Sequence, residues 1–485
     1  CRCPLEKEFL MRNNNQAEPA SSSAVTAFQP SPEEYQRRRQ ALLDLLPRGS
    51  VAIFPAADAK LRNGDDSHYL YRQSSEVLYL TGFPEDEAVL VLTKVSDNGQ
   101  DQFLLFVKER DPQEEQWNGK RIGIAESRSR FGADQVVDIR KFESQLPGIL
   151  RQASLVYLSQ DVNNELERQI RLKALQCGVS KRHLRRTVGP LGELRLIKSA
   201  SELAIMQRSA DIGTHAHNAG LMQCHAGMSE VELRSFIEHV FLLNGAAGPS
   251  YTTIVAGGEN GNCLHHLASP DILRDGQLVL VDAGCEFAGY ASDITRTYPV
   301  NGKFSPAQRE IYELVLAAQE AAIQAVKPGV VWSQLNKICD DTLFQGLEKL
   351  GFQLTRTKEA GGKLSLDDLM PHGLGHWLGL DVHDVGEKTL PGVRNKNERP
   401  LSPGMVFTVE PGLYLKADDE RIPARYRGIN VRIEDNIRVT DSGYAVLTSA
   451  AFKSVADIEQ MMEYALGMRR EGGDYMPVVP AKHKP

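Results

Sequence analysis

The segment from residue 278 to 297 limits the possible folds of this chain more than any other. An apolar run over residues 278–281 ends in Asp282, a turn follows near Ala288, and a second strand-like run contains Asp293. If the hairpin loop is centred between residues 287 and 288, Asp282 and Asp293 face each other on one side of a sheet, with Cβ atoms about 4.5–5.5 Å apart. The chain is therefore expected to fold around two neighbouring carboxylates.

This carboxylate pair is unfavourable unless something compensates it. Like charges directly opposite each other destabilise a sheet, and the apolar flanks indicate partial burial, which makes uncompensated charge costly. A shared proton, a bound cation or a different register, for instance through a bulge, would each relieve the conflict. A cation is the simplest remedy, but the pair alone leaves metal ligands and solvated acids beside a turn equally open.

Histidines and further acids gather later in the chain. His372, His376 and His383 fall in one segment whose glycines argue against a helix. Glu410 and Glu434 stand in or at the end of apolar strand patterns. A single histidine or strand-end glutamate is more often structural than functional, but three histidines in one glycine-rich segment favour a functional site.

Two more short segments are informative. Alternation along residues 430–435 puts Arg432 and Glu434 on one face of a strand. A glycine-rich turn at 257–261 precedes His265 and His266, but it lacks the lysine and the spacing of a phosphate loop. A pocket-lining role and a structural role for these two histidines remain equally open.

The order of the patterns predicts an α+β protein with two domains. Residues 1–30 form a polar tail of low complexity that we expect to be disordered. Residues 31–190 combine a helix that starts at Ser31-Pro32 with β-rich runs and further helices, as an α/β N-terminal domain would. Residues 195–460 show two helices followed by strands, and then the same order again, which is compatible with a duplicated α+β unit. Residues 461–485 are predicted to be a second tail.

Helix starts in the second domain carry their own signals. Ser199 with Glu202, and Ser229 with Glu232, match capping boxes ahead of apolar helical patterns. A third helix is expected to start at Ser305 and to end near residues 327–329.

Composition excludes some classes of function. The net charge of −7 gives no reason to expect a nucleic-acid or acidic membrane partner. No apolar run approaches the roughly 18 residues of a membrane helix, and residues 1–30 lack the apolar centre of a signal peptide. The seven scattered cysteines contain no C-x-x-C pair, which suits a reducing compartment. We therefore expect a cytoplasmic protein.

Taken together, these segments resemble the aminopeptidase P branch of the pita-bread metallopeptidases, a family that includes prolidase, methionine aminopeptidase and creatinase. The resemblance extends over residues 31–460 and rests on the Asp282/Asp293 pair, HGLGHWLGLDVHDVG, TVEPG and RIED. It implies that the duplicated α+β unit curves into a concave sheet that holds two metal ions.

The resemblance also implies roles for individual residues. The ligand set would be Asp282, Asp293, His376, Glu410 and Glu434, with Asp293 and Glu434 bridging both ions. The family usually uses Mn²⁺. Hard carboxylate ligands with one imidazole suit Mn²⁺, whereas a zinc site rich in thiolates would need cysteine ligands. Arg432 would not bind metal itself but would orient the carboxylates that do.

By the same resemblance the substrate is a peptide with proline in second position. A hydroxide that bridges the metals would attack the Xaa-Pro bond, and Glu410 would take a proton from the attacking water and pass it to the leaving proline nitrogen. His265 would stabilise the oxyanion, while His372 and His383 would hold the peptide near the proline.

Three residues are expected to bind substrate around this centre. Tyr251 in PSYTTIV is expected to line the pocket. Asp66 and Trp117 match segments that, in the family, reach toward the active site of a neighbouring subunit. The resemblance thus implies a homodimer or homotetramer.

Several alternatives remain. Prolidase uses the same metals on Xaa-Pro dipeptides, and the two specificities differ only in loops and rims. Non-enzymatic protein-binding relatives and creatinase-like hydrolases usually lack the metal ligands that this chain keeps. A binuclear phosphoesterase would be expected to carry a phosphate-cradling loop.

The sequence departs from the family pattern in three places. His266 stands where an aromatic residue is frequent, and Gly375 where serine is frequent. The segment 387–400 is several residues longer than in near relatives, which is expected to alter the rim of the cleft.

Overall fold

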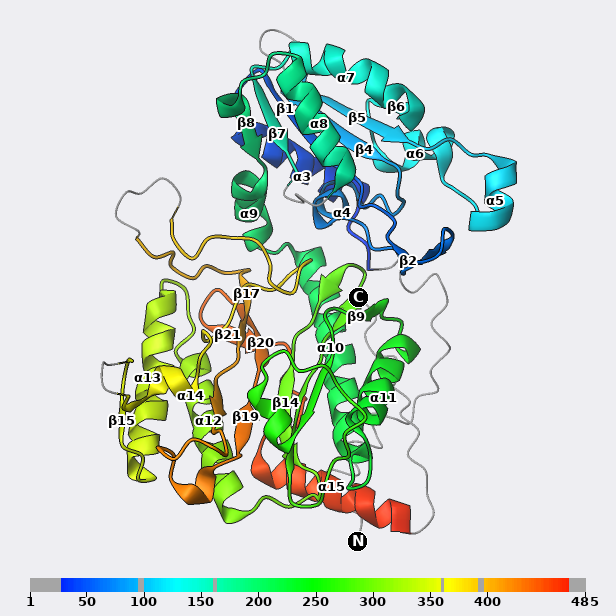
Figure 1. The fold of residues 1–485 in the computed structure, drawn as a ribbon. Coiled ribbons are helices and arrows are strands. Elements are labelled where there is room, and N and C mark those ends of the chain that lie inside the picture. The colour runs from blue at the N-terminus through cyan, green and yellow to red at the C-terminus, as the bar shows by residue number, and fades with distance from the viewer. Residues whose placement is uncertain (1–27, 95–99, 160–163, 359–361, 391–396, 471–485) are drawn as a thin grey trace. The chain divides into compact units, whose positions relative to one another are not determined.

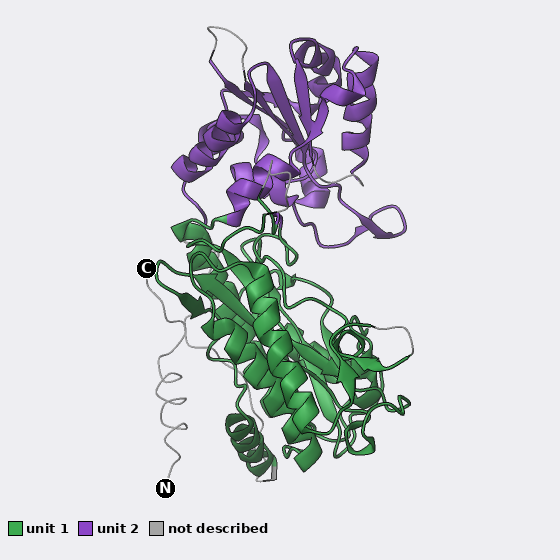
Figure 2. Ribbon diagram, turned by 90° about the vertical axis from the view of Figure 1, so that its left-hand side faces the viewer, with its two compact units in different colours: residues 1–28, 197–384, 388–485 green, residues 29–196, 385–387 purple. Residues whose placement is uncertain are grey.

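The computed structural model describes residues 28–94, 100–159, 164–358, 362–390 and 397–470. The chain divides into two compact units (Figure 2). The N-terminal unit holds residues 29–196 with 385–387, and the C-terminal unit holds 197–384 and 388–485 together with residues 1–28. The domain boundaries predicted above stay a prediction, and nearly all of the tail expected at 1–30 lies outside the described residues.

The N-terminal unit is built on a mixed sheet. Helix α3 (Pro32–Leu45) begins as expected, because the Ser31 side chain accepts a hydrogen bond from the Glu34 backbone N–H. The sheet has the strand order β6 (Gln135–Asp138), β5 (Gln102–Val107), β4 (Val89–Lys94), β1 (Ser50–Pro55), β7 (Leu155–Leu158) and β8 (Leu184–Arg186). Strand β4 runs antiparallel to both neighbours, and the other pairs are parallel. The expected α/β architecture is confirmed.

Helices complete this unit around an apolar core. They are α4 (Ser75–Thr81), α5 (Pro112–Asn118), α6 (Gly123–Phe131), α7 (Phe142–Arg151), α8 (Glu165–Gln176) and α9 (Val188–Leu196), with short helical turns η1 (Ile139–Lys141) and η2 (Lys181–His183). Leu146 of α7 and Ile170 of α8 pack on Val51, Ile53 and Phe106 of the sheet, and each such side chain contributes about 1.5–3 kcal/mol when fully buried. A small hairpin, β2 (Leu61–Asn63) and β3 (Ser67–His68), stays exposed.

The C-terminal unit contains two successive α+β halves (Figure 1). The first half comprises α10 (Ala200–Gln223), α11 (Glu230–Leu243), β9 (Gly248–Pro249), β10 (Ile254–Gly257), η3 (Gly258–Asn262), β11 (Leu278–Asp282), β12 (Cys285–Phe287), β13 (Tyr290–Ala291) and β14 (Thr295–Pro299). The second half comprises α12 (Pro306–Gln324), α13 (Trp332–Lys349), β15 (Leu354–Thr355), β16 (Leu364–Ser365), α14 (Leu366–Leu369), β17 (Val406–Val409), β18 (Gly412–Tyr414), η4 (Ala424–Tyr426), β19 (Asn430–Arg432), β20 (Asp435–Val439) and β21 (Tyr444–Val446).

The two halves meet where β14 lies beside β19. The Glu434 backbone N–H donates to the Thr295 carbonyl at 3.0 Å, and Thr297 Oγ1 donates to the Arg432 carbonyl at 3.0 Å. Figure 1 shows these strands between the pair α10–α11 and the pair α12–α13. The predicted capping boxes begin α10 and α11. The predicted helix after Ser305 also forms, but α12 ends at Gln324, before residues 327–329.

The hairpin register proposed for the aspartate pair is wrong. Asp282 pairs with Thr295, and Phe287 pairs with Tyr290, so the loop is centred between Ala288 and Gly289. Both loop residues have positive φ, 48° and 86°, as a two-residue type I′ turn requires. The observed register differs from the expected one by two residues. A shift by one residue would turn each side chain to the other face of the sheet, but a shift by two leaves the faces unchanged. Asp293, in the irregular stretch before β14, therefore still faces the same side as Asp282.

The chain end also departs from expectation. Helix α15 (Val455–Arg470) includes the first part of the tail predicted at 461–485, and Met461 and Met462 are buried. Apolar residues at helical spacing in this stretch were overlooked, and residues 471–485 lie outside the described part. Among the described helices, none has the length and apolar character to cross a bilayer.

Candidate metal centre

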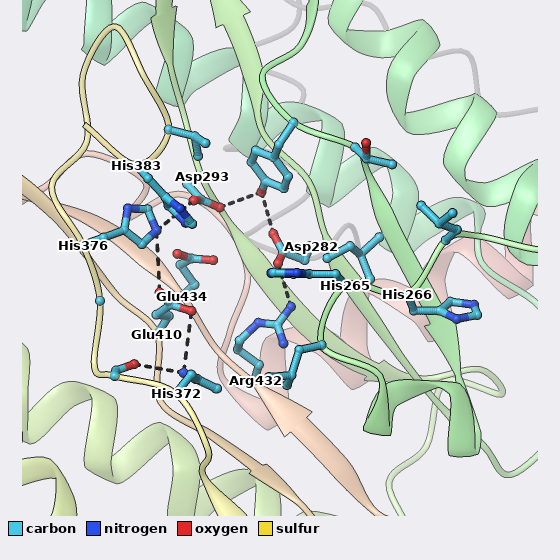
Figure 3. Close-up of a pocket in the computed structure, with 18 residues that line it drawn as sticks. His265, His266, Asp282, Asp293, His372, His376, His383, Glu410, Arg432 and Glu434 are labelled. Atoms are coloured by element: carbon cyan, nitrogen blue, oxygen red, sulfur yellow. Dashed lines mark hydrogen bonds and ion pairs between the residues drawn. The ribbon is translucent and has the colours of Figure 1, made fainter. Parts of the chain in front are cut away.

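Five strand ends and loops of the C-terminal unit bring acids and a histidine together (Figure 3). Asp282 ends β11, Asp293 precedes β14, and Glu434 lies between β19 and β20. Glu410 follows β17. His376 lies in a segment that pairs with β17, since its backbone carbonyl accepts from the Thr408 N–H. Strand ends suit such a site, because the backbone is fixed up to the residue that carries the functional group.

The distances define a tight group of side chains. Ligand atoms of Asp293, His376 and Glu434 all lie within 4.8 Å of one another. His376 Nε2 is 3.3 Å from Asp293 Oδ2 and 3.6 Å from Glu410 Oε1. The Tyr251 hydroxyl lies 2.5 Å from Asp282 Oδ1 and 2.6 Å from Asp293 Oδ1, and so connects the two aspartates.

A chain of hydrogen bonds holds Asp282 from the other side. Arg432 Nη2 donates to Asp282 Oδ2 at 2.6 Å, and Arg432 Nη1 donates to the Tyr414 hydroxyl at 2.7 Å. The Tyr414 hydroxyl also lies 2.8 Å from His372 Nε2. Arg432 is buried, so its cation is directed at this aspartate rather than at solvent.

Electrostatics in the group favour neutral acids or an added cation. Burial, together with the charge of Asp282, raises the pKa of Asp293. Burial and the charges of Asp293 and Asp282 raise the pKa of Glu434. Burial and the charge of Glu434 raise the pKa of Glu410 to about 8. One arginine does not balance this many carboxylates, whereas a bound cation would restore their ionised forms.

The donor atoms fit a divalent metal ion. Carboxylate oxygens with one imidazole are the ligands that ions such as Mn²⁺ accept. His376 Nδ1 lies 3.0 Å from the Trp377 carbonyl, which can only accept a hydrogen bond, so Nε2, beside the acids, is the nitrogen available to a metal ion. Glu434 Oε1 is buried and has no hydrogen-bond donor among the described residues. Such an oxygen normally has a partner.

The group lies in a pocket of about 540 Å³. The remaining histidines expected at the site, His265, His372 and His383, also line it, as do the apolar side chains of Ile254, Leu264, Leu267 and Val382. The ring centroids of His376 and His383 are 4.2 Å apart. Burial lowers the pKa of His372 to about 4 and also lowers the pKa of His383. The pocket thus offers neutral imidazoles and an apolar wall beside the carboxylates.

Asp66 and Trp117 do not line this pocket. Asp66 lies in the exposed turn between β2 and β3, and Trp117 in α5 is 86% exposed. Both belong to the N-terminal unit, and their predicted approach to a neighbouring subunit stays a prediction.

The sequence reasoning missed Tyr414. The sequence pattern could have indicated it. β18 pairs with β19, with residue 412 opposite 432 and residue 414 opposite 430, and alternation puts residues 412 and 414 on one face. Recognising that second hairpin would have placed the Tyr414 hydroxyl next to Arg432.

The structure shows the surroundings of two departures from the family pattern, Gly375 and part of the long segment 387–400. A Cβ atom at Gly375 would lie 2.0 Å from the Thr408 carbonyl oxygen, so this backbone conformation admits only glycine. In the long segment, Leu390 donates to Asn397 and Arg399 donates to Lys388 through backbone hydrogen bonds, while residues 391–396 lie outside the described part.

The fold and the acid-rich pocket define a pita-bread metallopeptidase. Residues 204–441 match metallopeptidase family M24, and residues 35–157 match the aminopeptidase P N-terminal domain. The chain belongs to metallopeptidase family M24, and membership of this family implies bound divalent metal ions.

Similarity to individual proteins covers nearly the whole chain. The chain is 41% identical to the Xaa-Pro aminopeptidase of Escherichia coli over 89% of its own length and 98% of that protein. It is 32% identical to human Xaa-Pro aminopeptidase 3 over 89% of this chain and 86% of that protein. It is also 35% identical to the mitochondrial intermediate cleaving peptidase 55 of Arabidopsis thaliana, over 89% and 83% of the two chains.

Solved structures agree with the sequence relatives. Proline aminopeptidase P II from Yersinia pestis superposes with a TM-score of 0.82 at 40% identity, over 90% of this chain and 100% of that chain. Escherichia coli aminopeptidase P with the inhibitor Pro-Leu superposes with a TM-score of 0.82 at 39% identity, over the same shares of the two chains.

Proposed function

We propose that this chain is an Xaa-Pro aminopeptidase that removes the first residue from peptides with proline in second position. The observation that carries the proposal is the group of four carboxylates and one imidazole in a single pocket with an apolar wall. Relatives named Xaa-Pro aminopeptidase support this specificity, as does the relative that binds the inhibitor Pro-Leu.

Asp282, Asp293, His376, Glu410 and Glu434 would hold two divalent metal ions. Mn²⁺ is the proposed metal, because four of the five donor groups are carboxylates. When bound, the ions would provide a nucleophilic water near neutral pH and polarise the scissile carbonyl. Arg432 would hold Asp282 in its ligating orientation through the bond at 2.6 Å.

The chain's own groups would move protons and hold the peptide. Glu410 would accept a proton from the attacking water and deliver it to the leaving proline nitrogen. His265 would donate to the developing oxyanion. His372, fixed by the Tyr414 hydroxyl, and His383 would contact the peptide around the proline, and Tyr251 would keep the two aspartates at their spacing.

Further parts of the proposal concern assembly and location. We propose a homodimer or homotetramer in which Asp66 and Trp117 approach the pocket of a second copy, since Trp117 is 86% exposed. A reducing, cytoplasmic setting is the proposed location, since Cys177, Cys224, Cys263, Cys285 and Cys339 are free.

The test compares two substrates on metal-reconstituted protein. After chelator treatment and addition of Mn²⁺, the protein should release the first residue of an Xaa-Pro-Xaa tripeptide and cleave an Xaa-Pro dipeptide poorly. Asp293→Asn serves as the control and should be inactive. Preference for the dipeptide would assign prolidase specificity instead, and metal-independent cleavage would refute the metal mechanism.

A further inference from the structure

A buried carboxylate outside the metal centre holds a neighbouring loop at several points. Glu230 is the first residue of α11, and its side chain is 1% exposed. Its Oε1 accepts hydrogen bonds from the Gly257 backbone N–H and from Asn260 Nδ2, each at 2.8 Å. Its Oε2 accepts from the backbone N–H and the hydroxyl of Ser269, each at 3.0 Å. The two oxygens therefore fix both ends of the loop 257–269.

The same carboxylate also binds the middle of the loop through His266. His266 Nε2 lies 2.8 Å from Glu230 Oε2. His265, one residue earlier, lines the pocket, and Figure 3 shows it directed toward Asp282 and Arg432 while His266 extends away from them. Fixing His266 therefore also fixes the backbone that carries the neighbouring ring.

The charge state of Glu230 agrees with this arrangement. Although burial opposes ionisation, hydrogen bonds from Asn260, Gly257, His266 and Ser269 hold the pKa of Glu230 below its usual value. An ionised carboxylate only accepts hydrogen bonds, so His266 must carry a proton on Nε2.

Helix capping does not account for Glu230. The first turn of α11 already has a complete capping box, in which Ser229 accepts from the Glu232 N–H and Glu232 accepts from the Ser229 N–H. A carboxylate at a helix N-terminus gains a small stabilisation from the helix dipole when it is exposed, which does not explain burial against one loop.

We propose that Glu230 and His266 are positioning residues that hold His265 in the pocket beside Asp282 and Arg432, where it meets the carbonyl of the bound peptide. This inference rests on the proposed function of the same pocket. Loss of either residue would let the His265 ring leave its place without removing any proposed metal ligand.

The first experiment is Glu230→Gln on the Mn²⁺-loaded protein, with Glu232→Gln as a matched control on the same helical turn. Glu230→Gln should lower kcat by up to about 100-fold, the effect of a displacement near 1 Å, with KM and bound Mn²⁺ changed little. Glu232→Gln should keep kcat within about twofold of the parent. Equal kcat in Glu230→Gln and the parent would overturn the proposal.

A double-mutant cycle separates positioning from general stability. In a His265→Ala background, Glu230→Gln should lower kcat by less than about twofold, because the residue it positions is already absent. If the two losses multiply, Glu230 acts through the fold and not through His265. An inactive parent protein would instead refute the proposed function.

A second pair of variants covers the case in which Glu230→Gln fails to fold. His266→Gln keeps a donor to Glu230 and should retain most of the activity, whereas His266→Phe removes the donor and should lose kcat as Glu230→Gln does. Equal activity of the two His266 variants would contradict the proposal.

Discussion

Glu434 and Asp435 are consecutive buried acids with opposite electrostatic surroundings. Asp435 accepts hydrogen bonds from Arg296 at 2.7 Å and Lys453 at 2.9 Å. Although burial opposes ionisation, these two cations keep the pKa of Asp435 below its usual value. Glu434 faces the pocket, where burial and the charges of Asp293 and Asp282 raise its pKa.

The contrast separates two uses of a buried charge. The counter-charges of Asp435 are part of the chain, so that ion pair is complete when the protein folds. Glu434 has acids as its nearest charged neighbours, and its Oε1 has no donor among the described residues. Burying an uncompensated charge is costly, so its counter-charge is expected to come from outside the chain, as a metal ion.

The largest expected effect comes from removing the charge of Glu434. Glu434→Gln should abolish Mn²⁺-dependent peptide cleavage, with a loss well beyond the roughly 10–100-fold typical of residues that only support metal ligands. It should also raise the melting temperature of the metal-free protein, because the amide removes like-charge repulsion at nearly constant shape. Peptide assays and thermal unfolding measure both, and a less stable metal-free variant would contradict the comparison.

Removing the partner of Asp435 should instead cost stability. Arg296→Met leaves Asp435 buried with only Lys453 as a cation, and breaking a buried pair in this way costs about 3–5 kcal/mol. Urea denaturation of the metal-free protein measures the loss. Arg274→Met is a surface control and should change stability by less than about 0.5 kcal/mol.

His217 lies near both sets of charges and should respond to acid. It is fully buried and bonded to the Ala283 carbonyl, and burial lowers its pKa to about 4. In the unfolded chain this histidine takes up a proton near pH 6.5, so the stability that neutral His217 gives the folded state is fully present above that pH. It is lost as pH falls from about 6.5 to 4, by about 3 kcal/mol in all.

The check on His217 is a difference between two proteins. Between pH 7.5 and 4.5 the parent should lose more stability in urea than His217→Gln does. Parallel losses would show that His217 does not carry the effect.

The smallest expected effect is a proton released on metal binding. With a pKa of about 8 in the metal-free protein, Glu410 is mostly protonated at neutral pH. Mn²⁺ affinity should therefore fall at least about tenfold per pH unit below 8, and more steeply where Asp293 and Glu434, whose pKa values are also raised, release protons too. Calorimetry in buffers of different ionisation enthalpy measures the released proton, and Glu410→Gln should make the pH dependence shallower. An affinity independent of pH between 6 and 8 would show that Glu410 is ionised before metal binds.

The sequence predicted those features that depend on neighbouring residues. Ser199 and Ser229 cap their helices because the capping box is complete within four residues. Apolar runs such as 278–282 form buried strands. The gathering of the aspartate pair, the histidines and the glutamates was expected from the family resemblance and agrees with the pocket lining.

The hairpin register was predicted wrongly for a local reason, since the turn lies at Ala288-Gly289, one position later than assumed. Features that depend on distant parts of the chain were not predicted. The local pattern did not distinguish His265 from His266, because Glu230, 36 residues before His266, decides which ring turns away from Asp282 and Arg432. The opposite states of Glu434 and Asp435 depend in the same way on Arg296, 139 residues from Asp435, and on Lys453, 18 residues from it.

The junction of β14 and β19 has a consequence for when the enzyme can become active. Asp282 and Asp293 come from the first half of the C-terminal unit, whereas His376, Glu410 and Glu434 come from the second. A chain still on the ribosome, with only the first half synthesised, therefore carries an incomplete centre. Two separately produced halves should be inert alone and regain peptide cleavage only when mixed, so this unit is a natural scaffold for a split-enzyme reporter.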